Sequence, residues 1–480
     1  MKSFTKYFNP TVSFLMVLLL SCSIHNRQKS KASEYLMVDA KTKAYHKDGT
    51  RSYNDYQPFK TRTINLLADY QQPKQAPDLS IYGGDMSQQV EATGYFHVKK
   101  VGSRWWAIDP LGYKYVNIGL NSVKTGKTKV SKDALQQKFG SKENWTQETM
   151  QLLHNHGFNC AGSWSDTEAI IAYNKTAERP IAYTVNWSFM SSYGKKRGGT
   201  YMQPGHTGYP QDAIFVFDPE FESFCDTHAQ QLAKLKDDPH LFGHFSDNEM
   251  PFKFKALDNY LSLPTDDYGY MAAIKWLKDN GISKDSISNK NRAAFMALVA
   301  DKYFSTVAKA IKKYDPNHMY IGARFYSNEK NHAAFMKAAG KHLDLISTNY
   351  YNYWTPDSAQ MDNWTKWTNK PFIITEYYTK GEDSGMGNTS GAGWIVRTQK
   401  DRGLFYQNYT LALLESKNCV GWHYFKYMDN DPNAKGVDPS NIDANKGIVT
   451  ATYEPWTPML DEMKPLNLQV YHLIKYLDHK

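Results

Sequence analysis

Short apolar runs alternate with longer amphipathic stretches over most of this chain. The stretches repeat apolar residues at helical spacing, as in NRAAFMALVADKYFSTVAKAIKKY at 291–314. Eight runs alternating with such stretches predict a parallel sheet, and eight units predict a closed (β/α)8 barrel. Periodicity alone also allows an open, doubly wound sheet. The runs occupy residues 115–120, 158–164, 181–187, 241–249, 319–326, 343–351, 371–378 and 419–425.

The segment before the barrel has a different pattern. In YFHVKKVGSRWWAIDPLGYKYVNIGL at 95–120, alternating apolar residues are interrupted by turn signals at 102–103 and 109–112. This predicts a β-meander whose last run enters the barrel, so the catalytic barrel with its meander is expected over 95–480. Residues 61–94 are interpreted as a flanking segment, and the polar residues 22–60 as a tether.

The first residues have the features of a targeting segment. Lys2 and Lys6 precede the apolar run VSFLMVLLL, which is short for a membrane span, and Ser21 stands before Cys22 in LLSC. This resembles a bacterial lipobox and predicts a signal peptide over 1–21 and lipidation of Cys22; an ordinary secretory signal is the alternative. The following SIHNRQKSK lacks an acidic cluster, which favours an outer-membrane lipoprotein facing the periplasm over one at the cell surface.

Composition excludes several classes of function. The chain has 480 residues, of which 41% are hydrophobic and 14% aromatic, enough for a large core and for stacking on sugar rings. The net charge of +9 comes without a long basic run, so nucleic acid is a poor partner, while an anionic polysaccharide remains possible. Four scattered cysteines argue against a disulfide framework or a zinc site. No phosphate loop, dinucleotide fingerprint or His/Cys cluster is present, so we expect no cofactor and no catalytic metal.

Two glutamates follow apolar runs at places where a barrel would bring them together. Glu249 ends the fourth run, in HFSDNEMPF, and Glu376 lies in the seventh, PFIITEYY. Barrel active sites lie at the carboxyl ends of the strands, and carboxylates about 5 Å apart are the arrangement used in retaining glycoside hydrolysis. The alternative for Glu249 is a surface carboxylate. Asn328-Glu329 is a second Asn-Glu pair, but its polar surroundings indicate a loop or helix start.

The pairing of Asn248-Glu249 with Glu376 resembles the retaining barrel glycosidases of clan A. More specifically, several stretches resemble the agarase-type enzymes of family fifty and their relatives. The stretches that carry this resemblance are WWAIDPLGYKYVNIGLNSV, HLFGHFSDNEMPF, YDPNHMYIGARF, GAGWIVRTQKDRGLFYQNY and VGWHYFKYMDND. It implies a retaining β-glycosidase that acts on galactan-type chains such as agarose or porphyran, with Glu249 as acid/base and Glu376 as nucleophile.

The resemblance also implies residues that bind substrate. Asn248 would bind the sugar 2-hydroxyl, which requires the strand to end or bulge so that adjacent side chains reach one site. Tyr351, favoured over Tyr350, would contact the nucleophile, and Trp422 would form the floor of the sugar site. Asp247 and His244 are expected to support the catalytic groups. Five residues that follow strand runs could line subsites or simply pack: Asn121, Trp164, Trp187, Arg324 and His423.

The sequence is compatible with two other functions. One is another β-glycosidase of the clan, such as a β-galactosidase; the other is a surface glycan-binding lipoprotein that lost its chemistry. A binder has no need for both carboxylates, so their joint presence favours an enzyme. The long segment 253–281, between the fourth and fifth strands, is large enough to close one end of a cleft, which favours exo-like cleavage.

Overall fold

Eight parallel strands form the central sheet of the computed structural model, which describes residues 34–45 and 51–479. The order across the sheet is β15-β14-β11-β10-β9-β20-β17-β16. The end strands meet through a parallel bridge between Phe325 and Thr348, which closes the ring. The predicted (β/α)8 barrel is therefore confirmed. The strands are β9 (Asn117–Leu120), β10 (Cys160–Ala161), β11 (Ala182–Asn186), β14 (Leu241–Phe245), β15 (Met319–Tyr320), β16 (Ile346–Asn349), β17 (Phe372–Glu376) and β20 (Cys419–Tyr424).

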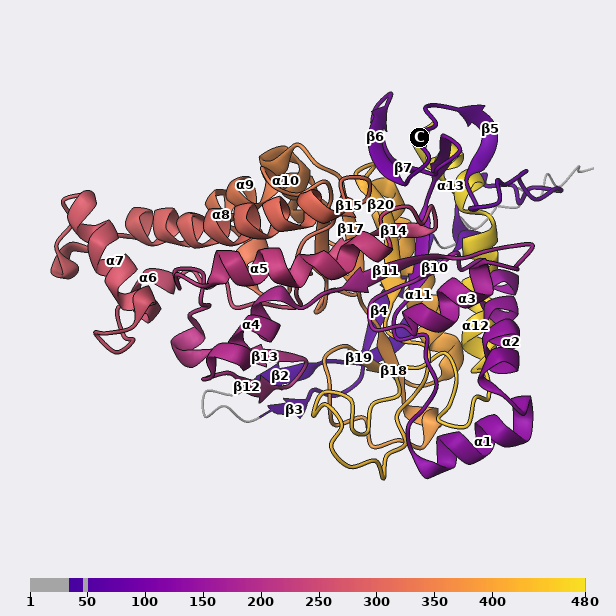
Figure 1. Cartoon of the computed structure of the whole chain (residues 1–480). Helices are drawn as coiled ribbons and strands as arrows, with labels where there is room; N and C mark the ends of the chain where they lie inside the picture. Colours follow the sequence, from indigo (N-terminus) through magenta and orange to yellow (C-terminus); the bar gives the residue numbers. More distant parts are fainter. Residues whose placement is uncertain (1–33, 46–50, 480) are drawn as a thin grey trace, which may run out of the picture. The chain divides into compact units, whose positions relative to one another are not determined.

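Helices follow the strands in the chain and cover the barrel (Figure 1). α8 (Asn289–Tyr314) shows why they form: Ser288 and Asn291 make a capping box, and the buried residues recur at helical spacing. In the view of Figure 1, α8 leads away from the sheet toward α6 and α7. The other helices are α1 (Lys129–Phe139), α2 (Lys142–Asn155), α3 (Thr167–Asn174), α4 (Phe189–Arg197), α5 (Phe221–Ala229), α6 (Ala256–Tyr260), α7 (Tyr268–Asp279), α9 (Ala333–Gly340), α10 (Ser358–Thr368), α11 (Gln399–Glu415), α12 (Thr457–Leu468) and α13 (Val470–Asp478).

The predicted meander is also present. β5 (Asp85–Gln89), β6 (His97–Val101), β7 (Arg104–Ile108) and β8 (Tyr113–Tyr115) form an antiparallel sheet ordered β5-β8-β7-β6. Phe96 packs against Tyr115 and Phe242, with ring centroids 5.0 and 5.4 Å apart. These partners lie near the amino ends of β9 and β14, so the meander covers the end of the barrel opposite the strand ends that carry Glu249 and Glu376.

The expected tether over 22–60 needs correction in its described part. β1 (Leu36–Lys41) pairs with β4 (Gln57–Thr61) and with β19 (Trp394–Val396), which lies beside β18 (Thr379–Gly381). β1 buries alternate residues, Val38 and Ala40, so its short apolar face is part of the fold. A two-stranded sheet of β2 (Lys43–Tyr45) and β3 (Arg51–Tyr53) follows β1.

Two predictions about targeting concern residues that the structure does not describe. The signal peptide at 1–21 and the lipidated Cys22 both lie outside the described residues. Within residues 34–45 and 51–479, none of the helices has the length and apolar character needed to span a membrane. The remaining cysteines, Cys160, Cys225 and Cys419, are buried and unpaired.

Candidate active site

A cavity of about 770 Å³ opens at the carboxyl ends of the barrel strands. Four residues predicted for the site line it: Glu249, Glu376, Trp164 and Tyr351. They follow or end β14, β17, β10 and β16, four strands that are far apart in the sequence. The cavity is thus formed where the barrel fold was expected to bring its strand ends together.

Glu249 lies four residues beyond the end of β14, in a left-handed backbone conformation with φ 51°. Its Oε1 accepts a 2.7 Å hydrogen bond from Asn349 Nδ2, and its Oε2 lies 3.5 Å from His206 Nδ1. The strand has ended before Asn248, so strict alternation no longer applies. Asn248 does not line the cavity, but its Oδ1 lies 3.4 Å from Asn349 Nδ2, the donor to Glu249. Asn248 donates from Nδ2 to the carbonyl oxygen of Gly205 at 3.1 Å.

Glu376 is the last residue of β17, and both of its carboxylate oxygens accept hydrogen bonds. Arg324 donates to Oε1, and Tyr351 donates to Oε2 at 2.5 Å. Burial raises the pKa of Glu376 to about 7; Arg324 opposes this shift and the nearby Glu249 adds to it. Tyr351 rather than Tyr350 is therefore the tyrosine beside this carboxylate, while the Tyr350 hydroxyl accepts from the backbone N–H of Asp357.

Asn349 connects the two carboxylates. It ends β16, where it pairs in register with Glu376, and its side chain reaches Glu249. The hydroxyl of Thr375 donates to Asn349 Oδ1 at 2.8 Å, so the amide nitrogen is the atom that faces Glu249. Asn349 was not among the residues predicted for the site, although its place at a strand end is the signal that identified Glu376.

Asp247 holds the wall behind Glu249. Its buried carboxylate accepts hydrogen bonds from the backbone N–H groups of Met190 and Ser191 at the start of α4, and from the hydroxyl of Tyr303 on α8. Burial raises the pKa of Asp247 to about 6. The residue therefore fixes two helices against the end of β14 and does not line the cavity.

Arg324 is fully buried beneath the cavity. Its guanidinium lies 4.4 Å from the ring centroid of Trp164 and 5.3 Å from that of Phe245. Its backbone is left-handed, with φ 54°. Arg324 thus acts on the site through Glu376 and through the position of Trp164, which itself lines the cavity.

Several other predicted residues do not line the cavity. Trp422 is fully buried and donates from Nε1 to the hydroxyl of Tyr406 on α11, because β20 turns this side chain outward. Phe425, just beyond β20, lines the cavity in its place. His423 donates to Asn117 inside the barrel, and burial, with a further contribution from Arg324, lowers its pKa to about 3.

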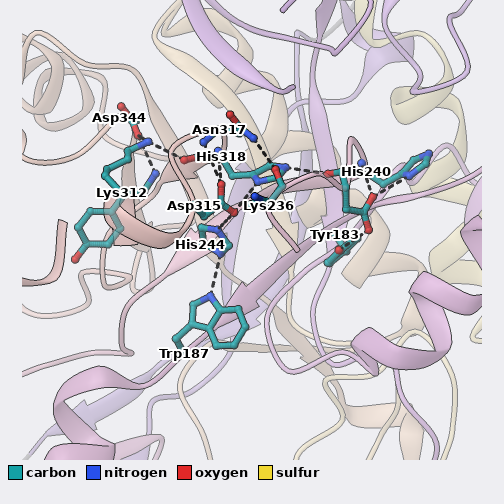
Figure 2. Close-up of polar contacts among 12 residues, drawn as sticks. Tyr183, Trp187, Lys236, His240, His244, Lys312, Asp315, Asn317, His318 and Asp344 are labelled. Carbon is teal, nitrogen blue, oxygen red and sulfur yellow. Dashed lines mark hydrogen bonds and ion pairs between the residues drawn. The ribbon is translucent and has the colours of Figure 1, made fainter. Parts of the chain in front are cut away.

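Asn121 and Trp187 do not line the cavity either, and their side chains donate hydrogen bonds to other residues of the chain. Asn121 is buried and donates to the carbonyl oxygen of Thr375 at 2.7 Å. Trp187 points toward His244 and donates to its Nδ1 at 2.9 Å (Figure 2). His244 therefore supports the wall between β14 and α8 and has no contact with either catalytic candidate.

His244, Asp315 and His318 could hold a metal ion, because one ligand atom of each lies within 4.8 Å of the others. Both rings bond to the same Asp315 oxygen, at 2.7 and 2.8 Å (Figure 2). The indole N–H of Trp187 occupies Nδ1 of His244, so the His244 proton lies on Nε2 and faces Asp315. Metal binding at Nε2 would require loss of that proton. We therefore interpret the three residues as a hydrogen-bonded cluster. These bonds lower the pKa of Asp315 well below its usual range, although burial raises it.

The second Asn-Glu pair and the long segment lie apart from the site. Glu329 is buried and accepts from the backbone N–H groups of Tyr326 and Ser327, as expected for a loop residue.

No residue of 253–281 lines the cavity, although the whole segment is described, so the expectation that it closes the cleft is wrong. The hairpin of β12 (Tyr201–Gln203) and β13 (His206–Gly208) and the loop 430–441 line it in its place.

Sequence reasoning missed the residues that come from these loops. They include aromatic and cationic side chains. The hairpin and the loop carry no strand-end or helical pattern, but Tyr326 and Tyr378 end the fifth and seventh apolar runs, so the signal that identified Glu376 could have found them. Lys43 on β2 lines the cavity from the segment that was expected to be a tether. The others include His206, Tyr326, Tyr378, Lys426 and Lys446.

The curated proteins that are similar to this chain in sequence include two β-agarases. No profile of a known protein family matches the chain. The chain is 25% identical over 507 residues to β-agarase B of Vibrio sp. (strain JT0107), an alignment that covers 83% of this chain and 51% of that protein. β-Agarase A of the same strain is also 25% identical, with 70% of this chain and 37% of that protein covered. The chain spans about half the length, or less, of these curated relatives.

A solved structure resembles almost the entire chain. The crystal structure of BpGH50 matches with a TM-score of 0.80 and 32% identity, covering 92% of this chain and 96% of that one. The agarase AgWH50C matches with a TM-score of 0.68 and 23% identity, covering 83% of this chain and 67% of that one, a likeness of fold.

Proposed function

The chain belongs to glycoside hydrolase family fifty, the agarase-type family, and on that premise we propose that it is an exported, retaining β-glycosidase of galactan chains such as agarose or porphyran. One observation carries the retaining part of this proposal. Glu249 and Glu376 line the same cavity from β14 and β17, and Asn349 contacts one while pairing in register with the other. Inverting enzymes also use two carboxylates, but theirs lie farther apart to admit a water between them, so a pair linked through one asparagine side chain supports double displacement.

In the first step, Glu376 attacks the anomeric carbon while Glu249 protonates the glycosidic oxygen, and the leaving chain departs. A covalent glycosyl ester on Glu376 results. Glu249, now a carboxylate, then removes a proton from water, and the hydroxide displaces Glu376 with a second inversion. The hydrogen bonds from Arg324 and Tyr351 favour the carboxylate form of Glu376, which suits a nucleophile.

Other residues have roles that follow from their positions. Asn248, held by Gly205, would bind the sugar 2-hydroxyl, a contact that strengthens in the transition state. Trp164 and Phe425 line the cavity and pack edge to face, with ring centroids 6.1 Å apart, so they offer aromatic surfaces to a sugar ring. Trp422 and Asn121 would act only through the residues that they hold.

The decisive experiment follows the configuration of the first product by proton NMR during hydrolysis of agarose and porphyran oligosaccharides. The proposal requires the β-anomer to appear first and to mutarotate later. Glu249→Gln and Glu376→Gln variants should each lose at least about 10⁴-fold in kcat while still binding substrate. An α-anomer as first product, or full activity in either variant, would disprove the double displacement.

The location of the enzyme is proposed from its first residues. A lipid on Cys22 would anchor the protein in the outer membrane, facing the periplasm, where it would meet imported oligosaccharides and cleave them from one end. The test combines protease shaving of intact cells with a time course on a long polymer. Cleavage of the protein on intact cells, together with a collapse of viscosity before short products appear, would show a surface-exposed, endo-acting enzyme.

A further inference from the structure

Three of the lysines that line the active-site cavity follow one another toward Glu376. Lys124 lies after β9 and is exposed, whereas Lys426 and Lys446 are buried in the segments after β20. Each lies within electrostatic reach of the next, and Lys446 is within reach of Glu376. Positive charge therefore extends from solvent to the candidate nucleophile.

The hydrogen-bond partners of the two buried ammonium groups are uncharged. Lys426 Nζ donates to Asn430 Oδ1 at 2.8 Å, and Lys446 Nζ donates to Ser440 O at 2.6 Å and Asn441 Oδ1 at 2.9 Å. An ammonium group has three N–H donors, so both lysines keep donors for another acceptor. Burial lowers the pKa of Lys426 to about 8 and that of Lys446 to about 7. The pKa values fall because burying a cation without a close counterion is unfavourable.

The nearest aspartates already have donors of their own. Asp429 accepts from the backbone N–H of Gly447 and from the side chains of Asn445 and Trp456. Asp438 accepts from the backbone N–H of Gly205 at 3.1 Å and from that of Ser440 at 2.7 Å. These carboxylates hold the loop in place, and they leave the lysine donors for a group that enters the cavity.

A sugar can reach these donors while stacked on the cavity wall. Lys446 Nζ lies 4.7 Å from the ring centroid of Tyr378 and 5.3 Å from that of Phe425, and both rings line the cavity. An aromatic surface for the sugar ring next to an ammonium group suits a sugar with a negatively charged substituent.

We propose that Lys426 and Lys446 form a subsite for an anionic substituent, a sulfate ester or a carboxylate, on a galactan residue near the scissile bond. This rests on the proposed function, because it names the substrate class of the same site. The entering anion supplies the counterion that both buried ammonium groups lack, and Lys124 at the entrance attracts it from solution.

The test measures kcat/KM on three oligosaccharides of equal length: a neutral, a sulfated and a carboxylated galactan. Lys426→Met and Lys446→Met should each lower kcat/KM at least about tenfold on an anionic substrate, and less than about threefold on the neutral one. Lys446→Arg keeps the charge and should retain most of the preference. Lys275→Met is the matched control, because its side chain is 75% exposed on α7 and lies outside the cavity.

Each outcome decides the proposal. A loss confined to the sulfated or to the carboxylated substrate supports the subsite and identifies its anion. Equal losses on all three substrates mean that the lysines only hold the loop, which overturns it. A wild-type enzyme that cleaves only the neutral chain overturns the subsite and leaves the proposed function intact. If the wild type cleaves none, the proposed function fails, and calorimetric binding of the same oligosaccharides to wild type and Lys426→Met decides the subsite.

Discussion

Asn349 donates a 2.7 Å hydrogen bond from Nδ2 to Oε1 of Glu249, across β15, which lies between their strands in the sheet. Thr375 holds the amide in this orientation through its hydroxyl. A donor at this place stabilises Glu249 most when the carboxyl has given up its proton. In the proposed mechanism, the bond therefore becomes stronger during the step in which Glu249 acts as an acid.

Replacement of Asn349 by Ala should lower kcat about tenfold and change KM less than about twofold, because a hydrogen bond to a charged group is lost in the transition state. Steady-state kinetics on an agaro-oligosaccharide checks this. Thr375→Val, which only frees the amide to rotate, should cause a smaller loss of about threefold. A rise in KM with unchanged kcat would show that Asn349 binds substrate and does not assist Glu249.

Azide should distinguish the roles of the two glutamates. In Glu376→Ala, azide takes the place of the nucleophile and should give the α-glycosyl azide. In Glu249→Ala, azide attacks the glycosyl-enzyme and should give the β-azide, and only from a substrate with a good leaving group. Proton NMR of the products decides between them. The reverse distribution would mean that the two roles are exchanged.

The raised pKa of Glu376 predicts the acid side of the pH profile. As the pH falls through about 7, Glu376 takes up a proton and can no longer attack, so kcat/KM should fall toward tenfold per pH unit. Arg324→Met removes a cation that lowers this pKa, so the midpoint should move to higher pH. Tyr351→Phe removes a hydrogen bond to the carboxylate and should move it in the same direction. A midpoint that moves to lower pH in either variant would contradict the assigned contacts.

The contacts of Asp247 predict a large effect on stability. Asp247→Ala leaves two backbone N–H groups and the Tyr303 hydroxyl without their acceptor, so the free energy of unfolding should drop by about 3 kcal/mol. Tyr303→Phe removes one donor and should cost about 1 kcal/mol. Urea unfolding at pH 7.5 measures both. A cost for Asp247→Ala no larger than that for Tyr303→Phe would show that the helix contacts contribute little.

The same carboxyl should also impose a pH dependence on folding. Its pKa is about 6 in the folded protein, above the value of about 3.9 expected for an unfolded chain, so the folded state binds the proton more tightly. The contribution of Asp247 to stability should therefore decrease as the pH rises from about 4 to about 6. Asp247→Asn removes this slope, which unfolding curves across that pH range would detect.

The barrel and the two glutamates were predictable because both depend on local pattern and on one topological rule. Apolar runs alternate with helical stretches, and a closed parallel sheet places all the carboxyl ends at one rim. Glu249 and Glu376 follow from that rule without any knowledge of loops. The choice of Tyr351 over Tyr350 followed from the family resemblance.

Other residues were placed wrongly or missed because the local sequence pattern does not determine where their side chains lie. β20 is buried on both faces, so its sequence does not show which side chains point inward, and Trp422 points outward. β1 buries only Val38 and Ala40, and one of its two partners, β19, lies far away in the sequence, so the local pattern did not separate it from a tether. His206 and Lys446 reach the cavity from a hairpin and a loop, whose positions depend on distant contacts such as that of Gly205 with Asp438.

The left-handed backbone conformation of Glu249 lowers the stability of the fold at the mouth of the barrel. Ser122, Trp164, Ser188 and Arg324, which also follow barrel strands, share positive φ values, a conformation that glycine adopts at less cost than any of them. Glycine at position 249 would therefore favour folding while removing the carboxyl that the chemistry uses. In a library selected only for heat resistance, glycine should accumulate around the mouth of the barrel, and the survivors should be the enzymes that no longer work.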